Sequence, residues 1–408
     1  MTCDNQLAKD AKTLYHQHFG DVDETTLCAA APGRVNLIGE HVDYTGGFVF
    51  PMAIDYMTVV YGSGKLSSEK TSIQLVSNLF PKQVEQIQEI PSKPPSKEEA
   101  HSSWTWYVLG VIAQYLPDLT DAKMPFFELK LAIVGNVPLG GGLSSSASLE
   151  VATARFLEGA FGISNVTEKE RALRCQKAEN EWCHSPCGIM DQYVSSAGKE
   201  GAALLIDCRS YEYQEVRMKE EEGSKAVTWV VTNSNVKHSI GGGEYPIRVA
   251  QCQQATKLIQ ETGADIQSLR DVTIVMLEKT SMDDVLYRRA KHVVMENQRT
   301  VEAKTRLESG NWKEVGRLMN ESHSSMRDDY EVSCEEIDIL TTLAQNFEGV
   351  YGSRLTGGGF GGCTVTLVEK NRVELLIEYL KREYKASTGK DCDCFETLPR
   401  AGARLLDV

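Results

Sequence analysis

The chain alternates between strand-like and helix-like spacing of its apolar residues, and no internal repeat is detectable. From Phe127 to Val134 large apolar residues occupy every second position, which predicts a strand. After a stretch of glycine and serine, Ala147, Val151 and Ala154 follow the spacing of a helix. From about Glu244 to Asn346 the pattern is mostly helical, and a further strand–helix alternation ends the chain. We therefore predict a mixed α+β protein with two lobes.

Two polar stretches suggest how these elements are divided. The stretch IPSKPPSKEEAHSS, residues 90–103, is rich in proline and charge and predicts an exposed loop or insertion. The stretch KEEEGSK, residues 219–225, separates the strand-like YEYQEVR from the β-branched AVTWVVTN and predicts a hairpin tip near a domain boundary. We predict an N-terminal lobe over residues 1–210 and a C-terminal lobe over residues 211–408.

A polar cluster lies in the glycine-rich segment APGRVNLIGEHVDYTGGFVFPMAI, residues 31–54. Arg34, Glu40, His41 and Asp43 fall within ten positions. Glycines allow tight backbone conformations, so such a segment can direct several side chains at one small ligand. Carboxylates and imidazole accept hydrogen bonds from hydroxyl groups, and guanidinium holds nearby negative charge. The segment therefore favours a hydroxyl-rich ligand, with a polar loop between two strands as the alternative.

The run NVPLGGGLSSSAS joins the predicted strand to the predicted helix. A strand, a glycine-rich loop and a helix N-terminus together favour phosphate binding, because unpaired N–H groups and the positive end of the helix dipole converge there. The spacing is not that of a Walker A loop. A capped helix after a flexible loop is the alternative. The residues predicted to contact nucleotide phosphates are Gly140, Gly141, Gly142, Ser144, Ser145 and Ser146.

A carboxylate available for a metal ion lies on the next predicted helix. Thr167 and Glu170 are spaced as a capping box that opens this helix. Further along, Glu179 shares a mostly apolar face with Trp182, where a carboxylate is costly unless it is paired or bound to a cation. Because Mg²⁺ needs only one or two protein oxygens beside phosphates and water, Ser146 and Glu179 would suffice. A solvated helix glutamate remains the alternative.

A second carboxylate follows Gly188 in the segment PCGIMDQY. Asp191 falls in the first turn of a new helical pattern, where negative charge is favoured. An aspartate in that position is most often a capping or first-turn charge, so its spacing alone does not predict catalysis.

Five segments resemble, in the family order, motifs of galactokinases in the GHMP small-molecule kinase superfamily. The resemblance covers about Cys28 to Val368 and is carried by the 31–54 segment, PLGGGLSSSAS, PCGIMDQY, SNVKHSIGGGEYP and LTGGGFGGCTVTLVE. It implies a two-lobed fold with an N-terminal lobe of mixed sheet and helices and a ferredoxin-like C-terminal lobe. ATP and a sugar would bind in the cleft between the lobes.

The resemblance also implies roles for single residues. Asp191 corresponds to the catalytic aspartate, and Arg34 would stabilise its charge and that of the transferred phosphoryl group. Trp104, in SWTWYVLG, corresponds to an adenine-pocket residue, with a buried aromatic core as an equal alternative. The glycines of residues 241–243 depart from the usual small-plus-serine pattern. The substrate-binding residues implied are Arg34, Glu40, His41, Asp43, Gly188, Asp191 and Tyr245.

The implied activity is transfer of phosphate from ATP, with Mg²⁺, to the anomeric hydroxyl of α-D-galactose. An N-acetylgalactosamine kinase and a non-catalytic sensor of galactose and ATP are the alternatives. Such sensors can lose residues from the Gly-Leu-Ser-Ser-Ser-Ala run, whereas that run is complete here through Ala147. A mevalonate-type kinase is disfavoured because the GEHVDY segment is present.

Composition narrows the partners. A net charge of −14 disfavours general binding to nucleic acid or to anionic membranes, although a metal ion and backbone N–H groups still allow an anionic nucleotide. No apolar run approaches the roughly 18 residues of a membrane span, and the first residues lack the apolar core of a signal peptide. Eleven scattered cysteines favour reduced thiols. We expect a cytoplasmic protein, monomeric or weakly dimeric, whose partners are galactose and MgATP.

Overall fold

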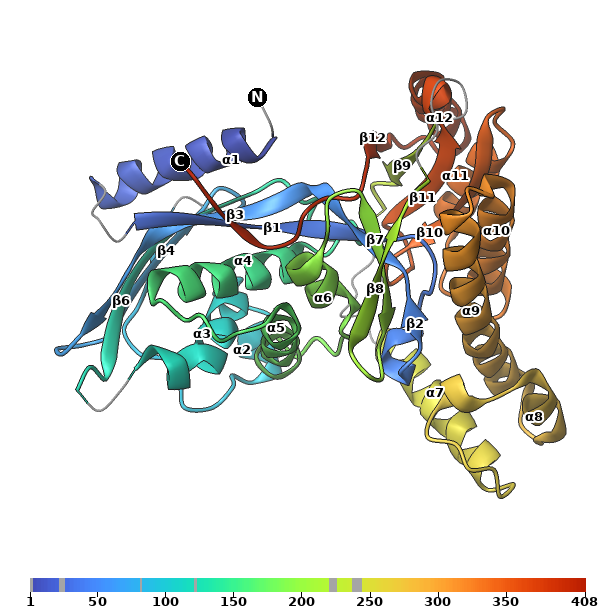
Figure 1. The fold of residues 1–408 in the computed structure, drawn as a ribbon, viewed down its shortest axis with the longest axis horizontal. Coiled ribbons are helices and arrows are strands. Elements are labelled where there is room, and N and C mark those ends of the chain that lie inside the picture. Colours follow the sequence, from blue (N-terminus) through green and yellow to red (C-terminus); the bar gives the residue numbers. More distant parts are fainter. Residues whose placement is uncertain (1–2, 22–25, 81–82, 121–122, 220–225, 237–243) are drawn as a thin grey trace.

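The computed structural model describes residues 3–21, 26–80, 83–120, 123–219, 226–236 and 244–408. Within these residues the protein has an N-terminal lobe around one large sheet and a C-terminal lobe around a smaller one (Figure 1). The α+β prediction with two lobes is therefore confirmed. No helix in the described ranges is long and apolar enough to cross a membrane.

The N-terminal sheet is covered by helices on both faces (Figure 1). Its described strands lie in the order β13-β1-β3-β6-β4-β5, and only β4 and β6 are parallel. Alternation along β1 explains the two layers, since Ala29 packs with helices α3, α4 and α5 while Cys28 and Ala30 pack with α1. The strands are β1 (Thr26–Asn36), β3 (Pro51–Ser67), β4 (Ser72–Ser77), β5 (Glu85–Ile87), β6 (Phe126–Gly135) and β13 (Arg404–Leu406). The helices are α1 (Cys3–Phe19), α2 (Lys97–Ala100), α3 (Thr105–Leu119), α4 (Ser145–Ala160), α5 (Glu168–Trp182) and α6 (Met190–Ala197).

The C-terminal lobe has a β-α-β-β-α-β arrangement with an inserted helical layer. Its antiparallel sheet has the order β10-β11-β9-β12, which is the ferredoxin-like pattern predicted by the resemblance. The strands are β9 (Val227–Asn233), β10 (Val350–Thr356), β11 (Cys363–Glu369) and β12 (Asp393–Thr397). The helices are α7 (Glu244–Gln260), α8 (Ile274–Lys279), α9 (Asp284–Glu308), α10 (Trp312–Asp328), α11 (Glu335–Gln345) and α12 (Val373–Thr388).

The two lobes are linked by strands as well as by the chain connection. A small sheet of β2 (Phe48–Val49), β7 (Ala202–Asp207) and β8 (Glu212–Arg217) lies between them (Figure 1). The final strand β13 returns to the N-terminal lobe and pairs with β1. The division at residues 1–210 and 211–408 stays a prediction, and this return places the last residues of the second range on the first sheet.

Local predictions agree with the structure except at helix boundaries. Strand β6, helix α4 and the helical region from α7 to α11 lie where the spacing placed them. The proline-rich stretch 90–103 is not all loop, because Ser96 caps the short helix α2. Thr167 accepts from the Glu170 N–H at 3.1 Å as predicted, but the Glu170 carboxylate pairs with Arg174. Residues 220–225 and 241–243, which carried two further predictions, lie outside the described residues.

Candidate active site

The predicted polar cluster lines one end of a cleft of about 390 Å³. Strand β1 ends at Asn36, and the chain turns through Gly39 and His41 into a short 3₁₀ helix that starts at Asp43. His41 has a φ of 60°, a left-handed conformation that non-glycine residues seldom adopt. The turn brings Glu40, His41 and Asp43 onto the same cleft as Arg34.

Arg34 and Asp191 form the centre of the cleft. Arg34 Nε donates to Asp191 Oδ1 at 2.8 Å and Arg34 Nη2 donates to Oδ2 at 2.7 Å, which is a two-pronged ion pair. Ser144 Oγ also donates to Asp191, and Arg34 Nη1 donates to the Gly142 carbonyl. The Arg34 side chain is buried, whereas that of Asp191 is 25 % exposed, so the carboxylate faces the cleft. The structure therefore joins residues predicted from three separate motifs.

Asp43 lies directly against Gly188. A Cβ atom at position 188 would fall 1.8 Å from Asp43 Oδ2, so only glycine fits there without moving the carboxylate. Burial and the nearby Asp191 charge raise the pKa of Asp43 to about 7. The two neighbouring carboxylates have different environments, because Asp191 is paired with Arg34 and Asp43 is not.

His41 and Tyr245 close this end of the cleft. Burial and the neighbouring His292 lower the pKa of His41 to about 3, so its imidazole is neutral near pH 7. His41 Nδ1 lies 3.2 Å from the Tyr44 hydroxyl, and the Tyr245 ring lies 5.6 Å from the His41 ring. Tyr245 lies near the start of α7, and its ring contacts connect the C-terminal lobe to the polar turn.

The glycine–serine loop lines another part of the same cleft. Gly140 and Gly142 have φ values of 70° and 72°, and Ser144, at the N-cap position of helix α4 but without a side-chain capping bond, has a φ of 62°. Gly357 approaches this loop so closely that a Cβ there would lie 2.8 Å from the Gly142 carbonyl oxygen. The LTGGGFGG segment, one of the five that carry the family resemblance, thus packs on the loop and supports it.

A hydroxyl group and a buried carboxylate adjoin the loop. Ser146 hydrogen-bonds to Glu179, and burial together with the Asp191 charge raises the pKa of Glu179 to about 7. Gln192 Nε2 donates to Glu179 and, at 3.1 Å, to the buried Glu150. A buried carboxylate near other acids gains most from a cation, and hydroxyl and carboxylate oxygens are the donors that Mg²⁺ prefers. The residues present therefore fit Mg²⁺.

Trp104 lies outside the main cleft, beside a smaller cavity of about 140 Å³. Its ring stacks on Phe80 with centroids 5.2 Å apart and an angle of 3° between the planes. Three residues line both this cavity and the main cleft: Tyr107, Ser145 and Ser146. Because this stacked pair is only partly buried and lines a cavity, its geometry favours contact with a flat aromatic ligand over the alternative of a closed aromatic core.

Sequence reasoning missed several residues that line the main cleft. Lys97 and His101 lie one helical turn apart at the end of the proline-rich stretch, which the sequence predicted only as an exposed loop. His184 Nε2 and the Pro95 carbonyl lie 2.7 Å apart, which fixes this stretch to the rim. Cys187 also lines the cleft, and only its place in PCGIMDQY pointed to it.

Comparison with known proteins agrees with this geometry. Residues 13–63 match the galactokinase galactose-binding signature, residues 107–199 the GHMP kinase N-terminal domain, and residues 303–386 the GHMP kinase C-terminal domain. The chain is 43 % identical to human galactokinase and 42 % identical to the bovine enzyme, over 93 % of this chain and 92 % of each relative. The chain belongs to the galactokinase family. A crystal structure of Lactococcus lactis galactokinase complexed with galactose has a TM-score of 0.87 and 32 % identity, over 98 % of this chain and 99 % of that one.

The three matched regions correspond to three parts of the cleft. The galactokinase signature contains the polar turn, and the GHMP N-terminal match contains the glycine–serine loop, Glu179 and Asp191. The C-terminal match contains Gly357, which packs on the loop. The family assignment and the site geometry therefore rest on the same residues.

Proposed function

We propose that the protein transfers the γ-phosphoryl group of MgATP to the anomeric hydroxyl of α-D-galactose, giving galactose 1-phosphate and ADP. The observation that carries the proposal is the Arg34–Asp191 ion pair, which lines the same cleft as the polar turn and is joined to the glycine–serine loop through Ser144. We call the end lined by Glu40, His41, Asp43 and Tyr245 the sugar end, and the end lined by Gly140, Gly142, Ser144, Ser145 and Ser146 the phosphate end.

At the centre, Asp191 is the residue that accepts the proton. The anomeric oxygen attacks the γ-phosphorus, the bond from that phosphorus to the ADP oxygen breaks, and the hydroxyl proton passes to the Asp191 carboxylate. Arg34 donates one hydrogen bond to each oxygen of this carboxylate and stabilises negative charge on the transferred phosphoryl group. Because phosphoryl transfer has a loose transition state, positioning and charge stabilisation supply most of the catalysis.

At the phosphate end, backbone N–H groups of the glycine–serine loop and the N-terminus of α4 bind the phosphates. Trp104 and Phe80 bind the adenine ring. Ser146 and Glu179 would hold Mg²⁺, which would neutralise phosphate charge. Lys97 adds a flexible cation at the rim.

At the sugar end, Asp43, Glu40 and neutral His41 accept hydrogen bonds from ring hydroxyls, and Tyr245 and Gly188 shape the wall. A site built to bond a hydroxyl discriminates strongly against a sugar that presents it elsewhere, because its own buried groups are then left unpaired.

The test is ADP release measured with galactose, N-acetylgalactosamine, glucose and mevalonate side by side. We expect turnover with galactose to exceed that with each of the others by at least tenfold. No galactose-dependent ADP, or faster turnover of mevalonate, would contradict the proposal.

We also propose that the protein acts in the cytoplasm as a monomer or weak dimer. The described cysteines are all free thiols, as expected of a reducing compartment. Light scattering at micromolar concentration tests the assembly, and a stable tetramer would contradict it.

A further inference from the structure

A buried cluster of charged and polar side chains lies behind the sugar end, in the C-terminal lobe. We call Glu296, Arg299, Ser322 and Arg354 the C-lobe cluster. All four are buried, yet none is among the described residues that line the cleft. Burying ions is costly unless geometry and hydrogen bonds compensate, so the cluster calls for a physical reason.

Glu296, on helix α9, binds the backbone of the polar turn from behind. Its Oε1 accepts from the Gly39 N–H at 2.9 Å and from the Glu40 N–H at 3.3 Å. Ser322 Oγ donates to the same oxygen at 2.6 Å, and Arg299 Nε donates to Oε2 at 2.8 Å. Burial opposes ionisation, but Arg299, His292, Arg354 and the Ser322 hydrogen bond together outweigh it and keep the pKa of Glu296 well below its ordinary value. A fixed anion therefore holds two consecutive amides of the turn.

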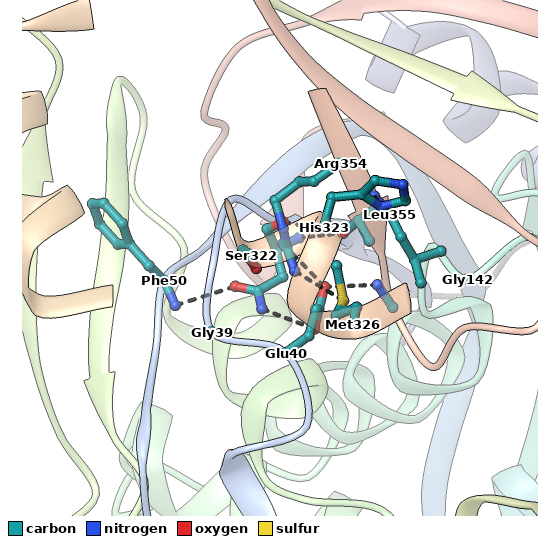
Figure 2. Close-up of polar contacts among 12 residues, drawn as sticks. Gly39, Glu40, Phe50, Gly142, Ser322, His323, Met326, Arg354 and Leu355 are labelled. Atoms are coloured by element: carbon teal, nitrogen blue, oxygen red, sulfur yellow. Dashed lines mark hydrogen bonds and ion pairs between the residues drawn. The ribbon is translucent and has the colours of Figure 1, made fainter. Parts of the chain in front are cut away.

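Arg354, on strand β10, adds a second set of contacts to the Glu40 side chain. Its Nη1 donates to the Asn36 carbonyl at 3.1 Å and lies 3.5 Å from Glu40 Oε1, and Figure 2 shows the side chain extending toward Glu40. The Gly357 N–H donates to Glu40 Oε1 at 2.8 Å, and Asn36 Nδ2 donates to Oε2 at 2.9 Å. Both the backbone and the side chain of Glu40 are thus held.

These contacts explain how the turn keeps a strained conformation. His41 follows directly, and its left-handed φ persists only where the surroundings determine it. His292, also on α9, lies 3.1 Å through Nε2 from the Glu40 carbonyl, so the peptide that leads into His41 is held on its oxygen as well.

We propose that Glu296 is a positioning residue for the sugar, an inference that rests on the proposed function. It holds the Gly39–Glu40 backbone so that His41 and Asp43 face the cleft in the conformation that accepts sugar hydroxyls. It touches neither substrate, and its effect passes through the turn.

The competing explanation is that Glu296 serves stability alone, and a matched pair of variants separates the two. In Glu296→Gln the new NH₂ group faces either the Gly39 and Glu40 N–H groups or Arg299, so at least one hydrogen bond is lost in either orientation. The control is Glu158→Gln, which breaks an equally buried ion pair to Arg171 with an N–O distance of 2.6 Å. Glu158 is not among the described residues that line the cleft.

We expect Glu296→Gln to raise the galactose KM about tenfold while the ATP KM and kcat change less than twofold. Calorimetric galactose affinity without ATP should fall by the same factor. Glu158→Gln should lower the melting temperature comparably and leave both KM values unchanged. Equal galactose KM values for the two variants and the wild type would overturn the proposal.

Two further measurements keep the test decisive. If Glu296→Gln does not fold, Ser322→Ala removes one donor to the same oxygen without changing charge, and it should raise the galactose KM two- to threefold with no change for ATP. An unchanged KM would overturn the proposal.

Amide hydrogen exchange of residues 37–44 in the ligand-free protein measures positioning without any substrate. Faster exchange in Glu296→Gln than in Glu158→Gln supports the positioning role even if the wild type fails to phosphorylate galactose, and identical exchange contradicts it. Failure of the proposed function and failure of this inference are therefore distinguishable.

Discussion

The sugar end of the cleft is lined by residues with charged and aromatic side chains, whereas the phosphate end is lined by glycines and serines. Glu40 and His41 lie on a turn that is held by residues more than 250 positions away. The phosphate loop takes its left-handed turns from its own glycines and leads directly into helix α4, although Gly357 of the C-terminal lobe also packs on it. Recognition of a particular sugar needs side chains in fixed places, while any triphosphate can be bound by a generic anion site.

The contrast predicts different sensitivities. Substitutions at the sugar end should weaken binding of galactose alone. Substitutions in its distant supports should have the same effect, because the geometry of this end is not locally determined. Substitutions at the phosphate end should weaken binding of ATP alone, and they should do so by straining the backbone of the loop. Asp191 belongs to both ends, through Ser144 on one side and the Asp43 charge on the other.

The largest effect is expected at this junction. Asp191→Asn keeps the shape of the side chain but cannot accept the proton, so kcat should fall about 10²–10⁴-fold. Galactose affinity, measured by calorimetry, should change much less. A variant with near wild-type kcat would assign Asp191 a first-turn structural role only.

The next effect separates the two ends. Asp43→Ala removes a hydroxyl acceptor and should raise the galactose KM about 10–100-fold, with the ATP KM within about twofold. We expect Asp43 to bind the axial 4-hydroxyl that distinguishes galactose from glucose, so the preference for galactose over glucose should narrow. Steady-state kinetics with each substrate varied in turn measure this. If both KM values rise together, Asp43 supports the lobe and does not contact the sugar.

The reciprocal change is Gly142→Ala. A methyl group at a φ of 72° strains the loop by about 1–2 kcal/mol, so the ATP KM should rise about tenfold while galactose affinity is retained. Gly162→Ala is the control, since its φ is 66° and no atom lies within 4 Å of the added carbon. Equal ATP KM values in the two variants would show that loop geometry does not limit nucleotide binding.

The smallest effect concerns the stability of the sugar end without ligand. Burial raises the pKa of Asp43 to about 7, so the folded state binds a proton more tightly than the unfolded state, and this contribution to stability is lost as pH rises toward 7. In Asp43→Asn the side chain does not titrate, so its contribution to stability does not change with pH. Because Asp43 is only half-buried, the effect should be small. Between pH 5 and pH 8 the free energy of unfolding of the variant should rise relative to that of the wild type by about 1 kcal/mol, or about 2 °C in melting temperature. Parallel pH curves for the two proteins would argue against a proton held at Asp43.

The two ends also differ in how far the sequence predicts them. The strand, loop and helix around Ser144 were predictable because each follows from adjacent residues, and the structure has them as β6 and α4. The ferredoxin-like lobe came from the resemblance, since periodicity alone gave only alternating elements. The pairing of β13 with β1 has no local signature, because strand partners far apart in the chain leave no mark in either segment.

The supports of the sugar end were not predictable for the same reason. Glu296 and Arg354 lie in a helix and a strand where a charged residue normally indicates an exposed face, yet both are buried. The position of Lys97 on the cleft was not predictable either, because the composition of residues 90–103 indicated only an exposed loop. The roles of the predicted site residues stay predictions, although the structure brings most of them together in one cleft.

The most direct test of the account is the identity of the product. Phosphorus NMR of a reaction with galactose and MgATP should show a sugar phosphate whose phosphorus couples to the anomeric proton, as required for galactose 1-phosphate. A 6-phosphate, or inorganic phosphate with unchanged sugar, would contradict the claim that this cleft transfers phosphate to the anomeric hydroxyl.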